Sequence, residues 1–390
     1  MPETPDPTIE WLEKARALIP LIEQHREKGE EERRLQDPVF EAFRQAGFFR
    51  MWMPSAYGGY ETPIESVLTV GEEVSRHDPS AAWNLIIGVI GSLLLAYLPE
   101  TTAQTILASD SDPYIAGAGS PAGAKAVSAD GGYVVSGTWA LASGCHHADW
   151  LFGGAFIYDD DKLRTNAEGR PEVSIFLFPR TQAEILDTWN AIGLRGTGSH
   201  HIKAEAVFVP DDLRLSIMTS PPVQSGPLYR GPILDGLGTL PVVSLGIARA
   251  AIDSFVELAA SKTPTQGRTK LADLQTTHER VGRAEMLLGA ARAFLFEVAR
   301  EIDQAWQSGR QLPRELAIKR RLANVNAVEA VMTIVDTLYI AAGTSTFYGE
   351  CRLPQCVRDI RTVSQHFVAS PSNVEMAGRY QLTGRFEPRL

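Results

Sequence analysis

Residues 139–150 gather several side chains capable of chemistry in one turn between two strand-like runs. After Trp139, the turn carries Ser143, a glycine, a cysteine and two histidines. The flanking runs, Gly132–Gly137 and Trp150–Tyr158, have the residue content typical of strands. Turns of this kind often carry binding or catalytic groups. A flat aromatic cofactor would fit against the sheet edge that this turn forms. A serine before a glycine also commonly caps its own turn, which is the alternative interpretation of Ser143.

A second candidate segment is the glycine-rich stretch Gly193–Ser199. Glycines let a backbone approach a ligand closely, so Arg195, Thr197 and Ser199 are candidate hydrogen-bond donors to a cofactor edge or a phosphate. The stretch follows no strand–helix–strand pattern and therefore does not match a dinucleotide-binding or phosphate-binding fingerprint. A flexible loop without a ligand is the alternative.

Two histidine pairs, His146-His147 and His200-His201, raise the question of a metal site. Neighbouring residues of a strand point to opposite faces, so each pair places only one ring in a given site. No nearby spacing of Asp or Glu completes a ligand set. We therefore expect no metal and interpret these residues as partly solvated turn histidines.

The elements that must position these residues change type along the chain. Helical periodicity covers about residues 8–108, a period of two covers about 114–212, and helical periodicity returns from residue 240. This pattern predicts three parts: an N-terminal helical domain (1–112), a β domain (113–213), and a Pro- and Gly-rich connector with an antiparallel helical bundle (214–390). A further helix is expected at 357–368 and another beyond Pro371.

Composition excludes several classes of protein. The 390 residues are 44% hydrophobic and carry a net charge of -10, which disfavours a nucleic-acid partner. The longest apolar run, Ile86–Leu98, is interrupted and too short for a membrane span. Three cysteines (Cys145, Cys351 and Cys356) cannot form a disulfide framework. With no signal-peptide pattern at the N-terminus, we expect a cytoplasmic protein.

Helices followed by a β domain and a bundle, together with six motifs in matching order, resemble the acyl-CoA dehydrogenase superfamily. The motifs are Phe48–Gly59, Asp78–Trp83, Gly137–Gly144, Asp187–Ser199, Val207–Pro210 and Arg358-Asp359. The resemblance covers nearly the whole chain. It implies an α+β fold with an N-terminal helical domain, a middle β-barrel-like domain and a C-terminal four-helix bundle.

One segment separates two branches of this superfamily. Many of the dehydrogenases place a carboxylate base in a Tyr-Glu-Gly-Thr segment shortly after the Arg-Asp pair, and that segment is missing here. Ser364-Gln365-His366 stands in its place and resembles the flavin-dependent monooxygenases, which include p-hydroxyphenylacetate hydroxylase, secosteroid phenol hydroxylase and dibenzothiophene monooxygenase. The resemblance implies an oxygenase component that uses reduced FMN or FAD and O2, through a flavin C4a-hydroperoxide, to hydroxylate an aromatic or other electron-rich small molecule.

The resemblance also assigns roles to individual residues. The predicted flavin-binding residues are Trp139, Leu141, Ser143, Arg195, Thr197 and Ser199. Ser143 is expected near flavin N5, where a hydrogen bond with its hydroxyl affects which flavin adduct survives. For this reason Ser143 is also a predicted catalytic residue. Arg268 is expected to bind the cofactor of a neighbouring subunit. The family's Arg-x-x-Phe-Gly core is not preserved around it, which favours FMN over FAD.

His366 and Trp83 are the predicted residues on the substrate side. His366 is expected to act as an acid or base with a pKa near neutrality, and on local sequence alone it is a helix histidine beside Phe367. Trp83 is expected to line the aromatic substrate's pocket, and on local sequence alone it fills the core.

The chain has no NAD(P)H-binding fingerprint, so we expect a separate NAD(P)H-dependent flavin reductase, and by resemblance a homotetramer packed through the bundle. Three alternatives remain open. One is an FAD-dependent acyl-CoA dehydrogenase whose base is Glu350, Asp359 or Glu375. The others are an amine N-oxygenase on the same fold and a helical scaffold that does not bind flavin.

Overall fold

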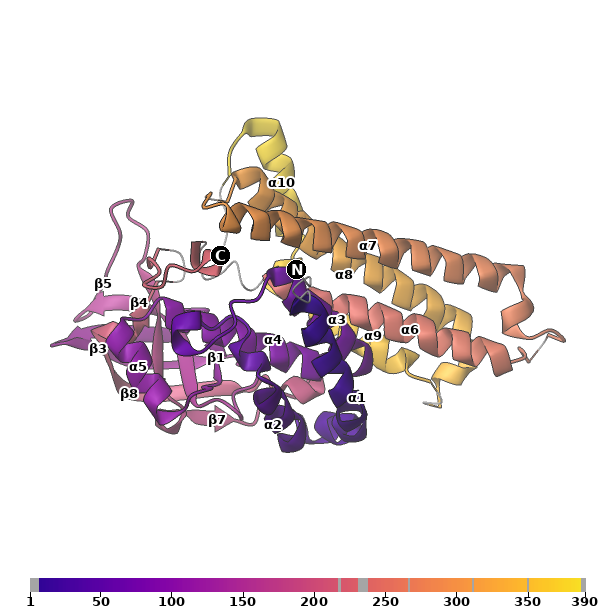
Figure 1. Cartoon of the computed structure of the whole chain (residues 1–390), viewed down its shortest axis with the longest axis horizontal. Helices are drawn as coiled ribbons and strands as arrows, with labels where there is room; N and C mark the ends of the chain where they lie inside the picture. The colour runs from indigo at the N-terminus through magenta and orange to yellow at the C-terminus, as the bar shows by residue number, and fades with distance from the viewer. Residues whose placement is uncertain are drawn as a thin grey trace, which may run out of the picture.

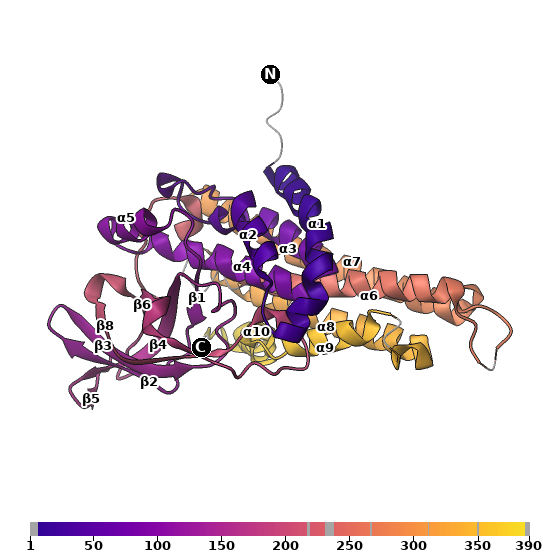
Figure 2. The ribbon, with the colours of Figure 1, turned by 90° about the horizontal axis from the view of Figure 1, so that it is seen from below.

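The computed structural model describes residues 7–216, 219–230, 238–265, 267–310, 312–348 and 351–386. Three parts follow one another along the chain: a group of helices, a β-sheet, and long helices that extend away from the sheet (Figure 1). Seen from below, the first helices lie over the sheet and the long helices project to one side (Figure 2). This is the order of elements that the sequence predicts.

The N-terminal part is helical. Its elements are α1 (Pro7–Glu32), α2 (Asp37–Ala46), η1 (Phe48–Arg50), η2 (Ser55–Tyr57), α3 (Ile64–His77), α4 (Pro79–Leu93), η3 (Leu94–Ala96) and α5 (Glu100–Ser109). Helix α4 begins at a capped position, because the Asp78 carboxylate accepts hydrogen bonds from the backbone N–H groups of Ser80 (2.8 Å) and Ala81 (3.2 Å). This cap fixes the start of the helix that carries Trp83.

Helix α4 is the core of the N-terminal part. The apolar window Pro79–Ala96 is long enough to cross a membrane but is 94% buried inside the protein, as a core helix is. A second window, Arg314–Thr346, passes the same test of length and composition and is half buried. Gly91 lets α4 pack directly on β1 (Ile115–Ala118), since a Cβ at this position would lie 2.0 Å from the Ile115 carbonyl oxygen. Helix α4 is thereby held against the sheet, in which β1 pairs with β4.

The middle part is a mixed sheet. Its remaining strands are β2 (Ala124–Ala129), β3 (Gly132–Trp139), β4 (Trp150–Asp159), β5 (Lys162–Leu163), β6 (Val173–Pro179), β7 (Glu184–Leu186), β8 (His201–Pro210) and β9 (Arg214–Leu215), with η4 (Arg180–Gln182), η5 (Arg195–Thr197) and η6 (Asp211–Leu213) between them. The strand order is β7-β8-β3-β2-β4-β6-β9, and β1 and β5 pair with β4. Strands β7 and β9 end this path of paired strands, and the described residues form the single β domain that the sequence predicts.

The C-terminal part begins after η7 (Pro227–Arg230) and consists of long helices. They are α6 (Val242–Ser261), η9 (Leu271–Asp273), α7 (Gln275–Gln307), α8 (Arg314–Ala342), η10 (Gly343–Thr346), α9 (Leu353–Val363), η11 (Phe367–Ala369) and α10 (Ser372–Thr383). The helix expected at 357–368 instead ends at Val363, and His366 follows it in an extended backbone conformation. His366 therefore lies in a turn between two helices and not on a helix face.

Candidate active site

Backbone hydrogen bonds join the turn after β3 to the segment before β8. The N–H of Ala142 donates to the His200 carbonyl and the N–H of Gly144 donates to the Thr197 carbonyl, each at 3.0 Å. Gly144 has a φ of +74°, which favours glycine, and a Cβ there would meet the Tyr114 hydroxyl at 2.4 Å. The two sequence segments that predicted a cofactor site therefore form one unit.

Three side chains of this unit and Trp83 of α4 form a continuous series of hydrogen bonds, which we call the hydroxyl row. The Trp83 Nε1–H donates to Ser143 Oγ at 3.1 Å, and Ser143 Oγ lies 2.7 Å from Ser199 Oγ. Ser199 Oγ lies 2.7 Å from Thr197 Oγ1, which donates to the Leu194 carbonyl at 2.8 Å. All four side chains are buried. Three of the predicted flavin-binding residues thus lie together beside Trp83.

His366 lies on the other side of Trp83. The two rings meet edge to face with centroids 5.3 Å apart, although 283 positions separate them in sequence. The Nδ1 atom of His366 is buried and has no hydrogen-bond partner among the described residues. Burial lowers the pKa of His366 to about 4, below the near-neutral value expected from the sequence, because loss of water around the ring disfavours its charged form. At neutral pH the ring is uncharged and one ring nitrogen is free to accept a proton.

Trp139 lies inside the sheet. Its side chain is 1% exposed, its Nε1–H donates to the Gly154 carbonyl, and its ring packs against Phe178. Gly153 makes room for it, since a Cβ there would lie 2.3 Å from the indole ring. Leu141 differs: its side chain is 61% exposed and its φ is +64°. Leu141 is therefore open to a ligand, whereas the side chain of Trp139 supports the turn from behind.

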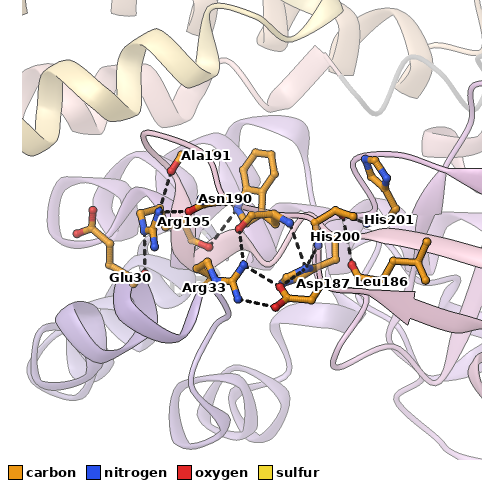
Figure 3. Close-up of polar contacts among 11 residues, drawn as sticks. Glu30, Arg33, Leu186, Asp187, Asn190, Ala191, Arg195, His200 and His201 are labelled. Carbon is orange, nitrogen blue, oxygen red and sulfur yellow. Dashed lines mark hydrogen bonds and ion pairs between the residues drawn. The ribbon is translucent and has the colours of Figure 1, made fainter.

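The two predicted arginines are placed differently. Arg195 donates to the carbonyl of Glu30, to the Asn190 side chain and to the Ala191 carbonyl, so its guanidinium fastens the glycine-rich loop to α1 (Figure 3). Arg268 is exposed and lies in the connection between α6 and α7, at the end of the bundle away from the sheet (Figures 1 and 2). Within one chain, Arg268 is not brought to the hydroxyl row.

The histidine pairs have structural contacts. The ring of His147 stacks on Phe40 with centroids 4.2 Å apart, and its Nε2 lies 2.9 Å from the Leu35 carbonyl oxygen. His200 is buried, contrary to the expectation of a partly solvated ring, and its Nδ1 accepts the backbone N–H groups of Thr188 and Trp189 (Figure 3). Within the described ranges, no group of three His, Cys, Asp or Glu side chains is arranged to hold a metal ion.

Asn84 and Asp359 support the site, and neither was predicted in this supporting role. Asn84 donates to the carbonyls of Ser80 and Gly196, and its Oδ1 is buried without a partner. Asp359 is buried and accepts the backbone N–H of Leu194 at 2.7 Å, and burial raises its pKa to about 7. The sequence placed Asp359 in the Arg-Asp motif and among the alternative dehydrogenase bases, and its contact with the distant glycine-rich loop is not visible in the sequence.

The carboxylates proposed for dehydrogenation have contacts of their own where the structure describes them. Asp359 is occupied by the Leu194 N–H, and Glu375 lies on α10 beside Arg379 at 3.8 Å. Glu350 lies outside the described residues.

The site fits a flavin chemically. It offers a serine hydroxyl in a buried row, an exposed leucine beside it, and two unpartnered buried polar atoms, His366 Nδ1 and Asn84 Oδ1. Such atoms cost free energy unless a ligand or water pairs with them.

Comparisons with known proteins agree with this geometry. The acyl-CoA dehydrogenase N-terminal domain matches residues 13–108, and the acyl-CoA dehydrogenase C-terminal domain matches residues 239–371. The chain is 30% identical over 368 residues to an indole-3-acetate monooxygenase of Pseudomonas putida, covering 93% of this chain and 91% of that protein. This chain belongs to the flavin-dependent monooxygenases of the acyl-CoA dehydrogenase superfamily.

Two further relatives support the assignment to this monooxygenase family. The HsaA oxygenase subunit of a flavin-dependent monooxygenase from Rhodococcus jostii is 29% identical over 387 residues, covering 92% of this chain and 94% of that protein. The structure of XiaF from Streptomyces sp., solved with FADH2 and glycerol, superimposes with a TM-score of 0.88 at 26% identity and covers 98% of both chains. The predicted fold and the monooxygenase branch are confirmed.

Proposed function

We propose that this monooxygenase is the oxygenase component of a two-component system that hydroxylates an aromatic or other electron-rich small molecule. A separate NAD(P)H-dependent flavin reductase supplies the reduced flavin, and O2 is the co-substrate. Support comes from the oxygenase-subunit relative and from the absence of an NAD(P)H-binding fingerprint in the sequence. The three free cysteines fit the reducing cytoplasm that we propose as its location.

The observation that carries the proposal is the position of Trp83 between Ser143 and His366. The indole N–H binds Ser143 Oγ, and the indole ring contacts the His366 ring. A reduced flavin bound beside Ser143 supplies the electrons that activate O2. The substrate then lies on the side of Trp83 and His366, in an apolar surrounding that suits an aromatic ring.

His366 is the proposed catalytic base. Its neutral ring has an unpartnered buried Nδ1, so it can accept a hydroxyl or amine proton from the substrate. Removing this proton makes the substrate ring richer in electrons and more reactive toward an electrophilic oxygen. The low pKa of His366 keeps its ring neutral at pH 7, which is the form that can accept a proton.

The remaining predicted flavin contacts divide into direct and supporting roles. We propose that Ser143 and Leu141 touch the flavin, and that Ser199, Thr197, Trp139 and Arg195 hold the walls on which it lies. The flavin is FMN or FAD, and parallel titrations with both reduced forms distinguish them.

We propose a homotetramer packed through the bundle, in which Arg268 reaches the cofactor of a neighbouring subunit. Support comes from exposed apolar side chains on α6, α7 and α8 and in the two residues directly after η10, which is unusual for a surface that faces water. Their exposed fractions are 48% for Val256, 60% for Met286, 73% for Ile340 and Phe347, and 79% for Tyr348.

The test combines the purified protein with chemically reduced flavin under anaerobic conditions, followed by mixing with oxygenated buffer. We expect saturable binding of reduced flavin and, on mixing, an absorbance transient that is absent for free flavin. A panel of phenols and indoles is then screened by mass spectrometry for a gain of one oxygen atom. Absence of both the transient and any oxygenated product would overturn the proposal, and bleaching of bound oxidised flavin by an acyl-CoA would favour the dehydrogenase instead.

A further inference from the structure

The two outer hydrogen bonds of the hydroxyl row have fixed directions. At one end, the Trp83 indole N–H can only donate, so Ser143 Oγ is its acceptor. At the other end, the Leu194 carbonyl can only accept, so the hydroxyl proton of Thr197 points at Leu194. The two bonds between them join hydroxyl groups, which can donate in either direction.

The Thr197 end decides the direction of both inner bonds. A hydroxyl has one proton, and that of Thr197 is used at the Leu194 carbonyl. The contact between Ser199 and Thr197 is therefore a bond in which Ser199 donates. Since the proton of Ser199 is then used, the contact between Ser143 and Ser199 is one in which Ser143 donates.

This direction leaves Ser143 with one free function. Its proton points into the protein toward Ser199, and one of its two lone pairs accepts the Trp83 indole N–H. The second lone pair is the only hydrogen-bonding capacity left on Ser143 Oγ. Toward a ligand, Ser143 is thus an acceptor and not a donor.

We propose that Thr197 and Ser199 are positioning residues that turn Ser143 into a fixed acceptor, and that this arrangement selects flavin carrying a proton on N5 over oxidised flavin. The inference rests on the proposed function, in which Ser143 lies beside flavin N5. Reduced flavin has an N5–H that donates to Ser143, whereas N5 of oxidised flavin has only a lone pair. Two facing lone pairs repel and leave both atoms without a hydrogen bond.

The surroundings oppose a reversal of the row. Ser199 and Thr197 are 4% and 1% exposed, so water does not readily supply a substitute donor. The backbone bonds of Ala142 to His200 and of Gly144 to Thr197 hold the serine turn and the glycine-rich loop at fixed separation. If Ser143 turned its proton toward a ligand, Ser199 would lose its donor in a buried place.

Thr197→Val tests the proposal because valine has nearly the same shape and no hydroxyl. The Leu194 carbonyl keeps a donor, since the Trp189 Nε1–H also binds it at 3.2 Å. Ser199 then loses its acceptor and can donate to Ser143, whose proton becomes free to point at the ligand. We expect the ratio of the oxidised to the reduced flavin dissociation constant to fall by about tenfold, the effect of one hydrogen bond.

Anaerobic titrations of wild type and variants with oxidised and with dithionite-reduced flavin measure this ratio. By thermodynamic linkage, a tenfold fall lowers the two-electron potential of the bound flavin by about 30 mV, which a dye-coupled reduction measures independently. Trp83→Phe is the matched control, because it removes a donor to Ser143 and leaves the direction of the row unchanged. We expect it to keep the ratio within about twofold.

A double-mutant cycle shows whether Thr197→Val acts through the hydrogen-bond direction of Ser143 or through a general disturbance of the flavin site. In a Ser143→Ala background, Thr197→Val should leave the ratio unchanged, because the group whose direction it controls is gone. The proposal is overturned if Thr197→Val leaves the ratio unchanged in the wild-type background, or lowers it equally in both backgrounds. Failure of the wild-type protein to bind either flavin would instead contradict the proposed function.

Discussion

Acidification should destabilise the flavin-free protein through His366, and the structure gives the size of the effect. Burial lowers the pKa of His366 from 6.5 to about 4, so the folded protein resists protonation of the ring and the unfolded chain does not. The stabilising contribution is fully present above pH 6.5 and is lost as the pH falls toward 4. A difference of about 2.5 pKa units corresponds to roughly 3 kcal/mol of the free energy of unfolding. This value is an upper limit, since the residue is partly exposed.

His366→Gln is the matched variant, because glutamine is polar and does not titrate in this range. Urea unfolding of wild type and variant at pH 7.5 and pH 4.5 yields the two free-energy differences. Other groups titrate in both proteins and cancel in the comparison, so wild type should lose more stability than the variant by up to about 3 kcal/mol. Equal losses would refute the assignment of His366 as a buried neutral ring. They would also remove the physical basis for its role as a base that is neutral at pH 7.

The other predictions concern catalysis, packing, the glycine-rich loop and assembly. His366→Ala should keep flavin binding and lower hydroxylation by about 10²-fold or more, measured as product formed per reduced flavin; unchanged turnover would remove it from the mechanism. Gly91→Ala should lower the melting temperature strongly, because its Cβ would lie 2.0 Å from the Ile115 carbonyl oxygen, and a native melting curve would contradict that packing. Asp359→Ala should weaken flavin binding by leaving the Leu194 N–H unpaired, at a cost of about 1–3 kcal/mol, while Asp359→Asn keeps an acceptor and retains most of the affinity. Ile340→Asp should shift the assembly to smaller species in light scattering, whereas an unchanged mass would place the interface elsewhere.

The sequence by itself was sufficient for the fold class and the branch of the superfamily. Helical and strand periodicity depend on which residues are buried at each step, so the change of period near residues 114 and 212 is encoded locally. The loss of the Tyr-Glu-Gly-Thr segment and the presence of His366 are likewise local features. The predicted fold class agrees with the observed order of elements, and the predicted branch agrees with the relatives.

The tertiary structure decided how the site residues act on one another. Trp83 joins Ser143 to His366 because α4, the turn after β3 and the turn after α9 converge, and no sequence pattern records a contact across 60 or 283 positions. Burial, which depends on all neighbouring elements at once, placed Trp139 inside the sheet and lowered the pKa of His366. The direction of the hydroxyl row follows from the bond of Thr197 to the Leu194 carbonyl, so it became visible only when Ser143, Ser199, Thr197 and Leu194 were placed in space.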